Sequence, residues 1–259
     1  PQRRIDRFSR SRLIKQFGKT LHLSEKVAVV SESMQQDYEQ NYGANTIIMR
    51  HGILPVQQSE KTKLSCIDKN IVIGFAGGLY AYSAWSCLME ALTLNDWKLN
   101  GRNVIVRVMG AGFYFQSKEK ANIEYLGWRS MSEAVKLLAD CDVNYLPYPF
   151  ESSSYYMVKY AFPTKLSTYA ATGRPVFVHA PEYSSLHRFY KKHPVGIYCS
   201  SLEPSEVITG LEKLVSNKEF YAEMSNKMVE MANGELSLEN FHKQFAEFVG
   251  IKRNTLLTK

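Results

Sequence analysis

The chain has 259 residues, of which 45% are hydrophobic and 22% charged, and this composition suits a globular core rather than a disordered chain. No apolar run reaches the roughly 18 residues needed to cross a bilayer, and the first residues hold no signal-peptide core. Because the chain begins with Pro rather than Met, we expect it to be part of a longer protein. Its cysteines form no CxxC pair, which disfavours zinc sites and disulfide frameworks and favours a reducing cytosol.

The net charge of +7 is concentrated at the amino end of the chain. Residues 1–30 hold eight Lys or Arg against two acidic residues, so they carry all but one of the net charges. Apolar residues at helical spacing among these cations predict a helix over about Ser9–Leu23 that packs on another surface; they are Leu13, Ile14, Phe17 and Leu21. A solvated helix face is one interpretation and contact with anionic lipid is the other, whereas nucleic acid is disfavoured because no binding module accompanies the charge.

Residues 27–52 hold two β-like runs, Val27–Val30 and Thr46–Met49, with a helix between them. Ser31 is suited to cap the start of that helix, and Gly43 is suited to end it after Tyr42. Two strands and two helices cannot close an independent core, so we interpret residues 1–52 as the end of a preceding domain. The polar stretch Gln57–Lys63 then predicts a linker.

From Lys69 onward, strands and helices alternate. Apolar runs predict strands at Ile71–Ala76, Val104–Met109, Asn122–Tyr125, Asp142–Leu146, Pro175–His179 and Val195–Cys199. Periodicity and caps predict helices at Ser83–Leu94, from Ser130 or Ser132 to Asp140, and at Pro163–Thr172, Pro204–Val215, Lys218–Ala232 and Leu238–Phe248. This alternation predicts an α/β fold with a Rossmann-like, doubly wound parallel sheet.

In an open parallel sheet, ligands bind outside the carboxyl ends of the strands. Gly77 and Gly78 follow the first of these strands, and glycines there let the backbone approach a ligand and offer N–H groups to phosphate oxygens. A tight turn that needs positive φ would use the same residues. No G-x-G-x-x-G sequence follows, so a dinucleotide fingerprint is not supported.

Two further strand ends carry candidate residues. The turn after the third strand, Gly127-Trp128-Arg129, is suited to holding a flat base. We expect the backbone of this turn to contact the base, because an ordinary core position is favoured for Trp128 over stacking of its ring on the base. Tyr148 opens a Ser- and Tyr-rich segment that runs to Tyr156 and could bond sugar hydroxyls, or could be a flexible surface loop.

The segment from Phe162 to Val176 holds the strongest signal. Pro163 suits a first helical turn, and the following amides of Thr164, Lys165 and Leu166 would face the ligand with the positive end of the helix dipole. Lys165 adds a full positive charge in the same turn, and these groups together predict a diphosphate site. One turn later, Thr168 could reach a ribose.

The order of these motifs resembles the nucleotide-binding half of GT-B glycosyltransferases, especially the family 4-like group (glycosyl transferases group 1). The matching residues are Val30-Ser31-Glu32, His51-Gly52, Gly77-Gly78, Gly110-Ala111-Gly112, Leu126-Gly127, Leu146-Pro147 and Pro163 through Val176. The resemblance covers nearly the whole chain, and its specificity comes from the ordered set at this spacing rather than from any single motif.

The resemblance implies an incomplete acceptor-binding domain in residues 1–52 and an interdomain linker in residues 53–68. It further implies a donor-binding domain in residues 69–236 and, in residues 237–259, a last helix that crosses back towards the first domain. It implies transfer that needs neither a metal ion nor another cofactor, with Lys165 as the catalytic residue that stabilises the diphosphate leaving group. The chain departs from the family where two Glu residues are typical, because Tyr160 and Thr168 stand there, which indicates a divergent subfamily.

We therefore expect a cytoplasmic glycosyltransferase that takes a UDP-sugar, or second a GDP-sugar, and acts on a glycan or lipid-linked acceptor in polysaccharide or glycoconjugate assembly. This stretch alone should bind nucleotide but transfer poorly, and residues 1–30 could hold it at the inner face of an anionic membrane. The alternatives are a UDP-sugar 2-epimerase of GT-B shape, for which no carboxylate pair is evident, and a non-catalytic domain that senses nucleotide or binds a partner protein.

Overall fold

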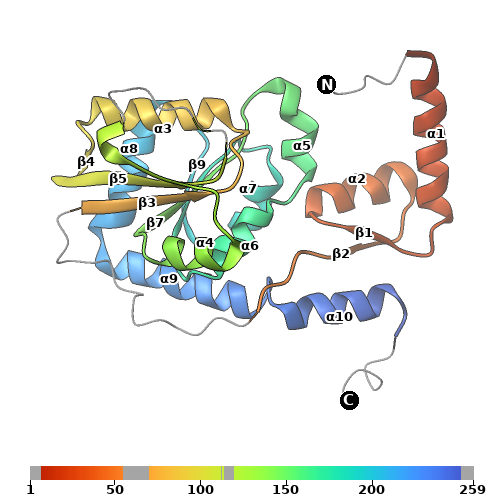
Figure 1. The fold of residues 1–259 in the computed structure, drawn as a ribbon. Helices are drawn as coiled ribbons and strands as arrows, with labels where there is room; N and C mark the ends of the chain where they lie inside the picture. Colours follow the sequence, from red (N-terminus) through yellow and green to blue (C-terminus); the bar gives the residue numbers. More distant parts are fainter. Residues whose placement is uncertain (1–6, 55–69, 112, 114–119, 252–259) are drawn as a thin grey trace.

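The structure is a computed structural model that describes residues 7–54, 70–111, 113 and 120–251. The predicted linker Gln57–Lys63 lies outside the described residues. The described chain forms two sheets, a small one in residues 27–48 and a large one in residues 70–199 (Figure 1). Within the described residues, no helix has both the length and the apolar character that a bilayer span requires.

The large sheet confirms the predicted α/β fold. Its parallel strands are β3 (Asn70–Ala76), β5 (Arg102–Met109), β6 (Ile123–Gly127), β7 (Val143–Pro147), β8 (Val176–His179) and β9 (Gly196–Cys199). They lie in the order β6-β5-β3-β7-β8-β9, which is the 3-2-1-4-5-6 order of a Rossmann sheet, so the strand order reverses between β3 and β7. A two-residue strand that the sequence did not predict, β4 (Lys98–Leu99), pairs antiparallel with the start of β5.

Helices cover both faces of this sheet, which is why its strands are almost continuously apolar (Figure 1). On one face lie α3 (Tyr82–Leu94) and α8 (Pro204–Ser216). On the other face lie α4 (Met131–Ala139), α6 (Thr164–Ala170), α7 (Ser185–Lys192) and most of α9 (Lys218–Asn233).

Local sequence signals predicted most of these helices and strands, and among the differences are the bounds of α4 and α6 and the presence of one further helix. Ser130, not Ser132, caps α4 through a reciprocal capping box with Glu133. The predicted helix Pro163–Thr172 is shorter than expected, because α6 ends at Ala170 and the chain then turns through Gly173 at φ +65°. The Ser- and Tyr-rich segment is not a loop: a 3₁₀ turn at Ser152–Ser154 leads into the helix α5 (Tyr155–Tyr160).

In the small sheet, β1 (Val27–Val29) pairs in parallel with β2 (Thr46–Ile48). The helix α2 (Glu32–Tyr42) packs on both strands, and α1 (Arg7–Leu23) packs on α2. Ser31 caps α2 and Gly43 ends it in the left-handed conformation, as predicted. On α1, Leu21 is buried and the ring of Phe17 contacts those of two tyrosines of α2. The predicted packing of α1 is therefore partial, since its remaining apolar residues, Leu13 and Ile14, are about half exposed.

Arg50 joins the small sheet to the large one. Its guanidinium forms salt bridges to Glu32 at the start of α2 and to Glu235 in the turn after α9, and it lies 4.8 Å from the ring centroids of Phe162 and Phe189. The last described helix, α10 (Leu238–Phe248), lies beside β2 (Figure 1). Just before this helix, Ser237 pairs with Ile53, which follows β2 in the chain. Two segments far apart in the chain thus meet at one buried cation.

The buried phenol of Tyr169 fixes α6 against the sheet. Its oxygen accepts a hydrogen bond from the amide of Ala76 at the end of β3 (3.2 Å) and donates one to the carbonyl of Tyr145 in β7 (3.1 Å). These two strands flank the point where the strand order reverses. The phenol therefore determines where the first turn of α6 stands relative to that point.

Replacing Tyr169 by Phe should lower the free energy of unfolding by about 1–3 kcal/mol, because it leaves the buried amide of Ala76 without its acceptor. Urea unfolding measures this loss. Tyr156→Phe is the matched control, since Tyr156 is 70% exposed and its variant should keep the stability of the wild type. Equal stability of the two variants would contradict this role of the phenol.

Candidate functional site

The carboxyl ends of β3, β5 and β6 meet at a row of three glycines, which are Gly77, Gly110 and Gly127. The amide of Gly77 donates to the carbonyl of Met109, and the amide of Gly110 donates to that of Gly127, both at 2.9 Å. Among the described residues, no atom stands within 4 Å of the position that a Cβ would take on Gly78 or Gly127, so none of them covers the backbone there. The row lies beside the reversal of strand order, which is the usual ligand position in this architecture.

Two of these positions require glycine. Gly77 has φ +102° and Gly110 has φ +143°, conformations that other residues adopt only with strain. A Cβ on Gly110 would lie 2.5 Å from the carbonyl oxygen of Gly77, and one on Gly77 would lie 3.0 Å from Cε of Lys165. Side chains at either position would therefore push apart the two turns or displace the lysine.

Lys165 extends from the first turn of α6 to the turn after β3. Its ammonium donates to the carbonyl of Gly78 at 3.1 Å and lies 4.4 Å from the ring centroid of Tyr80 and 5.6 Å from that of Phe75. Burial lowers the pKa of the Lys165 ammonium to about 8. These contacts are a neutral carbonyl and two aromatic faces, and none of them carries a negative charge. An anion bound beside the ammonium would therefore stabilise the protonated form of Lys165.

The first turn of α6 contributes less than the sequence predicted. The helix has only seven residues, so its dipole is small, and the amide of Leu166 donates to the carbonyl of Pro163 at 3.0 Å. Thr164 is exposed at the helix start, and its amide and that of Lys165 precede the first hydrogen bond of the helix. Most of the positive charge at this edge therefore comes from the Lys165 side chain.

Several predicted site residues lie beneath the edge rather than on it. Leu166 and Tyr148 are 1% exposed, and the hydroxyl of Tyr148 donates to the carbonyl of Ala161. Phe162 packs its ring against Arg50 and Phe189, on the side of the small sheet. The side chains of Leu166, Tyr148 and Phe162 support the site from below.

The turn after β6 lies at the surface. Trp128 is 74% exposed, so its interpretation as a core residue is wrong, and the guanidinium of Arg129 donates to the Trp128 carbonyl. The hydroxyl of Thr168 lies 3.7 Å from the sulfur of Met131, in the first turn of α4. Thr168 on α6 therefore stands close to the segment that follows Trp128 and Arg129.

Sequence reasoning missed two residues at this edge. The ring of Tyr80 covers the ammonium of Lys165. Its position two residues after Gly78 is a sequence signal for a place at this edge. Glu151 accepts a hydrogen bond from the amide of Ser83 in the first turn of α3, while its second oxygen is buried without a partner among the described residues. No local signal links Glu151 to Ser83.

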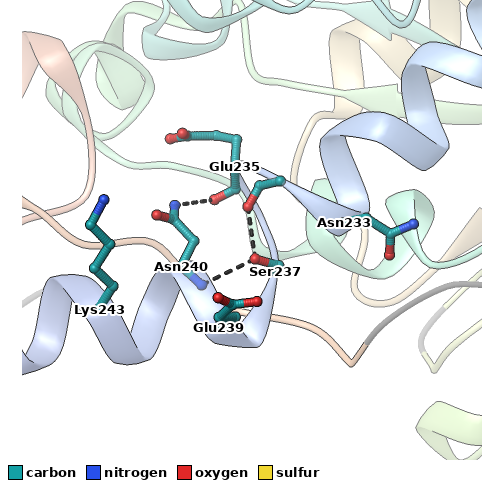
Figure 2. A pocket seen from close by; sticks show the side chains of 7 residues that line it. Asn233, Glu235, Ser237, Glu239, Asn240 and Lys243 are labelled. Atoms are coloured by element: carbon teal, nitrogen blue, oxygen red, sulfur yellow. Dashed lines mark hydrogen bonds between the residues drawn. The ribbon is translucent and has the colours of Figure 1, made fainter. Parts of the chain in front are cut away.

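A cavity of about 320 Å³ lies where α9 leads into α10 (Figure 2). Its polar groups are used locally: the hydroxyl of Ser237 donates to the carbonyl of Gly234 and accepts from the amide of Asn240, whose side chain donates to the carbonyl of Glu235 (Figure 2). The carboxylate of Glu235 pairs with Arg50. The polar groups that line the cavity thus form the N-terminal cap of α10 and its neighbouring hydrogen bonds.

Comparison with known proteins identifies the fold. No family model matches the chain. An uncharacterised glycosyltransferase of Haemophilus influenzae is 24% identical over 241 residues, covering 85% of this chain and 60% of that protein. The chain therefore spans about 60% of the length of this curated relative.

Solved structures share the architecture at lower identity. HepE from Anabaena, solved in complex with UDP, has a TM-score of 0.69 at 15% identity and covers 94% of this chain and 68% of its own. WaaG, a glycosyltransferase involved in lipopolysaccharide biosynthesis, has a TM-score of 0.61 at 13% identity and covers 96% of this chain and 71% of its own. The chain thus has the GT-B-like fold of these proteins.

We expect the ammonium of Lys165 to titrate near pH 8, because the amine is partly buried. Reductive methylation with ¹³C-formaldehyde followed by NMR measures the midpoint, and the signal missing from Lys165→Arg assigns it. Inorganic pyrophosphate should raise the midpoint, since a bound anion favours the charged amine. A midpoint above about 10, the ordinary range of lysine, would contradict the burial of this amine.

Proposed function

We propose that the protein is a glycosyltransferase whose residues 69–236 bind the nucleotide-sugar donor. The observation that carries the proposal is the Lys165 ammonium, which lies over the glycine turn after β3, beside the reversal of strand order. The chain has the fold of enzymes that include HepE, solved with UDP and glucose, and WaaG, involved in lipopolysaccharide biosynthesis. These likenesses support a UDP-sugar, or second a GDP-sugar, as donor and a glycan or lipid-linked acceptor.

In the proposed reaction, the bond between the anomeric carbon and the diphosphate oxygen breaks as an acceptor hydroxyl bonds to that carbon. The bonding electrons leave with the nucleoside diphosphate, and the acceptor hydroxyl loses its proton to a base. Negative charge grows on the diphosphate during this step. The Lys165 ammonium lies in a partly buried position where such charge is stabilised more strongly than in water.

The remaining donor contacts follow from the geometry of the edge. The amides of Gly78, Thr164 and Lys165 are proposed to meet diphosphate oxygens, with Gly77 giving the close approach. The open backbone of Gly127, with Trp128 and Arg129, is proposed to hold the base, and Thr168 the ribose. Residues 1–52 and 237–259 would belong to the acceptor side, joined to the donor side through residues 53–68 and Arg50.

Binding of UDP should raise the melting temperature of the chain. At a concentration of 100 times the Kd, the ligand stabilises the folded state by about 2.7 kcal/mol. Lys165→Ala should weaken binding at least tenfold, because it removes the charge that faces the diphosphate. Lys227→Ala is the matched control, since Lys227 lies on α9 and pairs with Glu223 at the surface. Unchanged melting with both UDP and GDP, or equal binding by Lys165→Ala, would overturn the donor site.

We further propose that α1 attaches the protein to the inner face of an anionic membrane. Leu13, Ile14 and Phe17 are each 44–49% exposed, and exposed cations such as Arg10 and Lys15 lie on the same helix. An interfacial helix of this kind buries its apolar side chains at the headgroup boundary while its cations meet anionic lipid.

This attachment should be weak and sensitive to salt, because much of it is electrostatic. The chain should float with vesicles that contain phosphatidylglycerol and not with pure phosphatidylcholine vesicles. Ile14→Glu should reduce flotation, while Leu94→Glu, an exposed position on α3, should leave it unchanged. Equal flotation with both vesicle types would exclude this role of α1.

A further inference from the structure

Four tyrosines form a continuous aromatic strip: three lie on α5, and Tyr183 lies in the turn before α7. The ring of Tyr183 lies 4.9 Å from that of Tyr155, which lies 5.3 Å from Tyr156, and Tyr156 stacks on Tyr160 at 6.3 Å with an angle of 15°. Tyr156 is 70% exposed, and Tyr155 and Tyr183 are each 37% exposed. Clusters of large exposed aromatic side chains on a protein surface commonly mark a binding surface.

A polar cavity of about 360 Å³ adjoins this strip, between α2, α5 and α7. Its lining consists of Ser33, Gln36, Asp37, Gln40, Asn41, Lys159 and Arg188. The strip and the cavity are continuous, because the hydroxyl of Tyr160 donates to the carboxylate of Asp37 at 2.9 Å and the ammonium of Lys159 lies 5.1 Å from the Tyr160 ring centroid.

The cavity holds both donors and acceptors in fixed positions. The guanidinium of Arg188 donates to the amide oxygen of Gln36 at 2.7 Å, and the amide of Asn41 donates to the carboxylate of Asp37 at 3.1 Å. Two cations, one carboxylate and three amide side chains give the lining a nearly balanced charge. Such a lining suits a ligand with many neutral hydroxyl groups rather than a multiply charged one.

We propose that the aromatic strip and the polar cavity bind the carbohydrate part of the acceptor. This inference rests on the proposed glycosyl transfer, and it extends the acceptor side from α2, in residues 1–52, across the cavity to α5 and α7 of the proposed donor-binding domain. A pyranose ring has a face of C–H groups, which lies flat on a tyrosine ring, and an edge of hydroxyls, which bond to amides, carboxylates and guanidinium groups. The ring planes of Tyr156 and Tyr160 differ by only 15°, whereas those of Tyr155 and Tyr156 differ by 81°, so it is the near-parallel pair that suits two neighbouring sugars.

The position of the strip agrees with this role. Only Ala161, Phe162 and Pro163 separate Tyr160 from the start of α6, whose first turn holds Lys165. The carbonyl of Ala161 accepts hydrogen bonds from Tyr148 and Ser185, which tie this connection to β7 and α7. Because α5 and the first turn of α6 both follow the carboxyl end of β7, a glycan on the strip would lie at the same edge of the sheet as the proposed donor.

A microarray of bacterial, plant and animal oligosaccharides, probed with the chain, tests this surface. The wild type should retain at least one class of glycan, and Tyr156→Ala combined with Tyr183→Ala should reduce that signal at least tenfold. Phe245→Ala is the matched control, because it removes another exposed ring, on α10, and should keep the signal. Absence of any retained glycan, or equal retention by the double variant, would overturn the inference.

The rise in melting temperature with UDP, measured on the same variants, separates this inference from the donor site. The double variant should keep the UDP-induced rise while it loses glycan. Glycan retention without any rise for the wild type would overturn the donor site and leave the strip supported. If the double variant instead loses flotation with vesicles and keeps its glycan signal, the strip is a lipid contact and the inference is wrong.

Discussion

The phenol of Tyr169 is the interaction on which the site depends. It bonds to the last amide of β3 and to a carbonyl of β7, so it bridges the two strands between which the strand order reverses. Since Tyr169 and Lys165 lie on successive turns of α6, this buried anchor also determines where the ammonium stands. The placement of one positive charge over the glycine turn thus follows from a hydrogen bond within the core.

In the described part of the chain, the printed contacts of the Lys165 ammonium are aromatic faces and one neutral carbonyl. Burial lowers the pKa of this ammonium to about 8. A group in this state gains stabilisation when an anion arrives, which is the condition for recognising a diphosphate and for stabilising it as it leaves. The short helix α6 contributes orientation more than charge, because its dipole extends over two turns and one of its first amides is already bonded.

Much of the fold could be predicted because its signals are local. The strands could be predicted from continuous apolar runs, and two helix starts from the capping residues Ser31 and Ser130. Glycines directly after strands indicated the edge of the sheet where a ligand would bind. What could not be predicted depends on tertiary contacts. Trp128 is exposed in the turn after β6, and Tyr80 and Glu151 acquire their roles from partners distant in the chain. The Ser- and Tyr-rich segment forms α5 where it packs between α2 and α7.

The proposed donor and acceptor sites lie on either side of a short connection, with Lys165 on α6 and the tyrosine strip on α5 and in the turn before α7. A crystal structure of the complete protein with UDP is the most direct test of the proposed donor site. We expect the diphosphate over Gly77 and Gly78, with Nζ of Lys165 within hydrogen-bonding distance of a phosphate oxygen. A nucleotide bound elsewhere, or a diphosphate that makes no contact with Lys165, would contradict it.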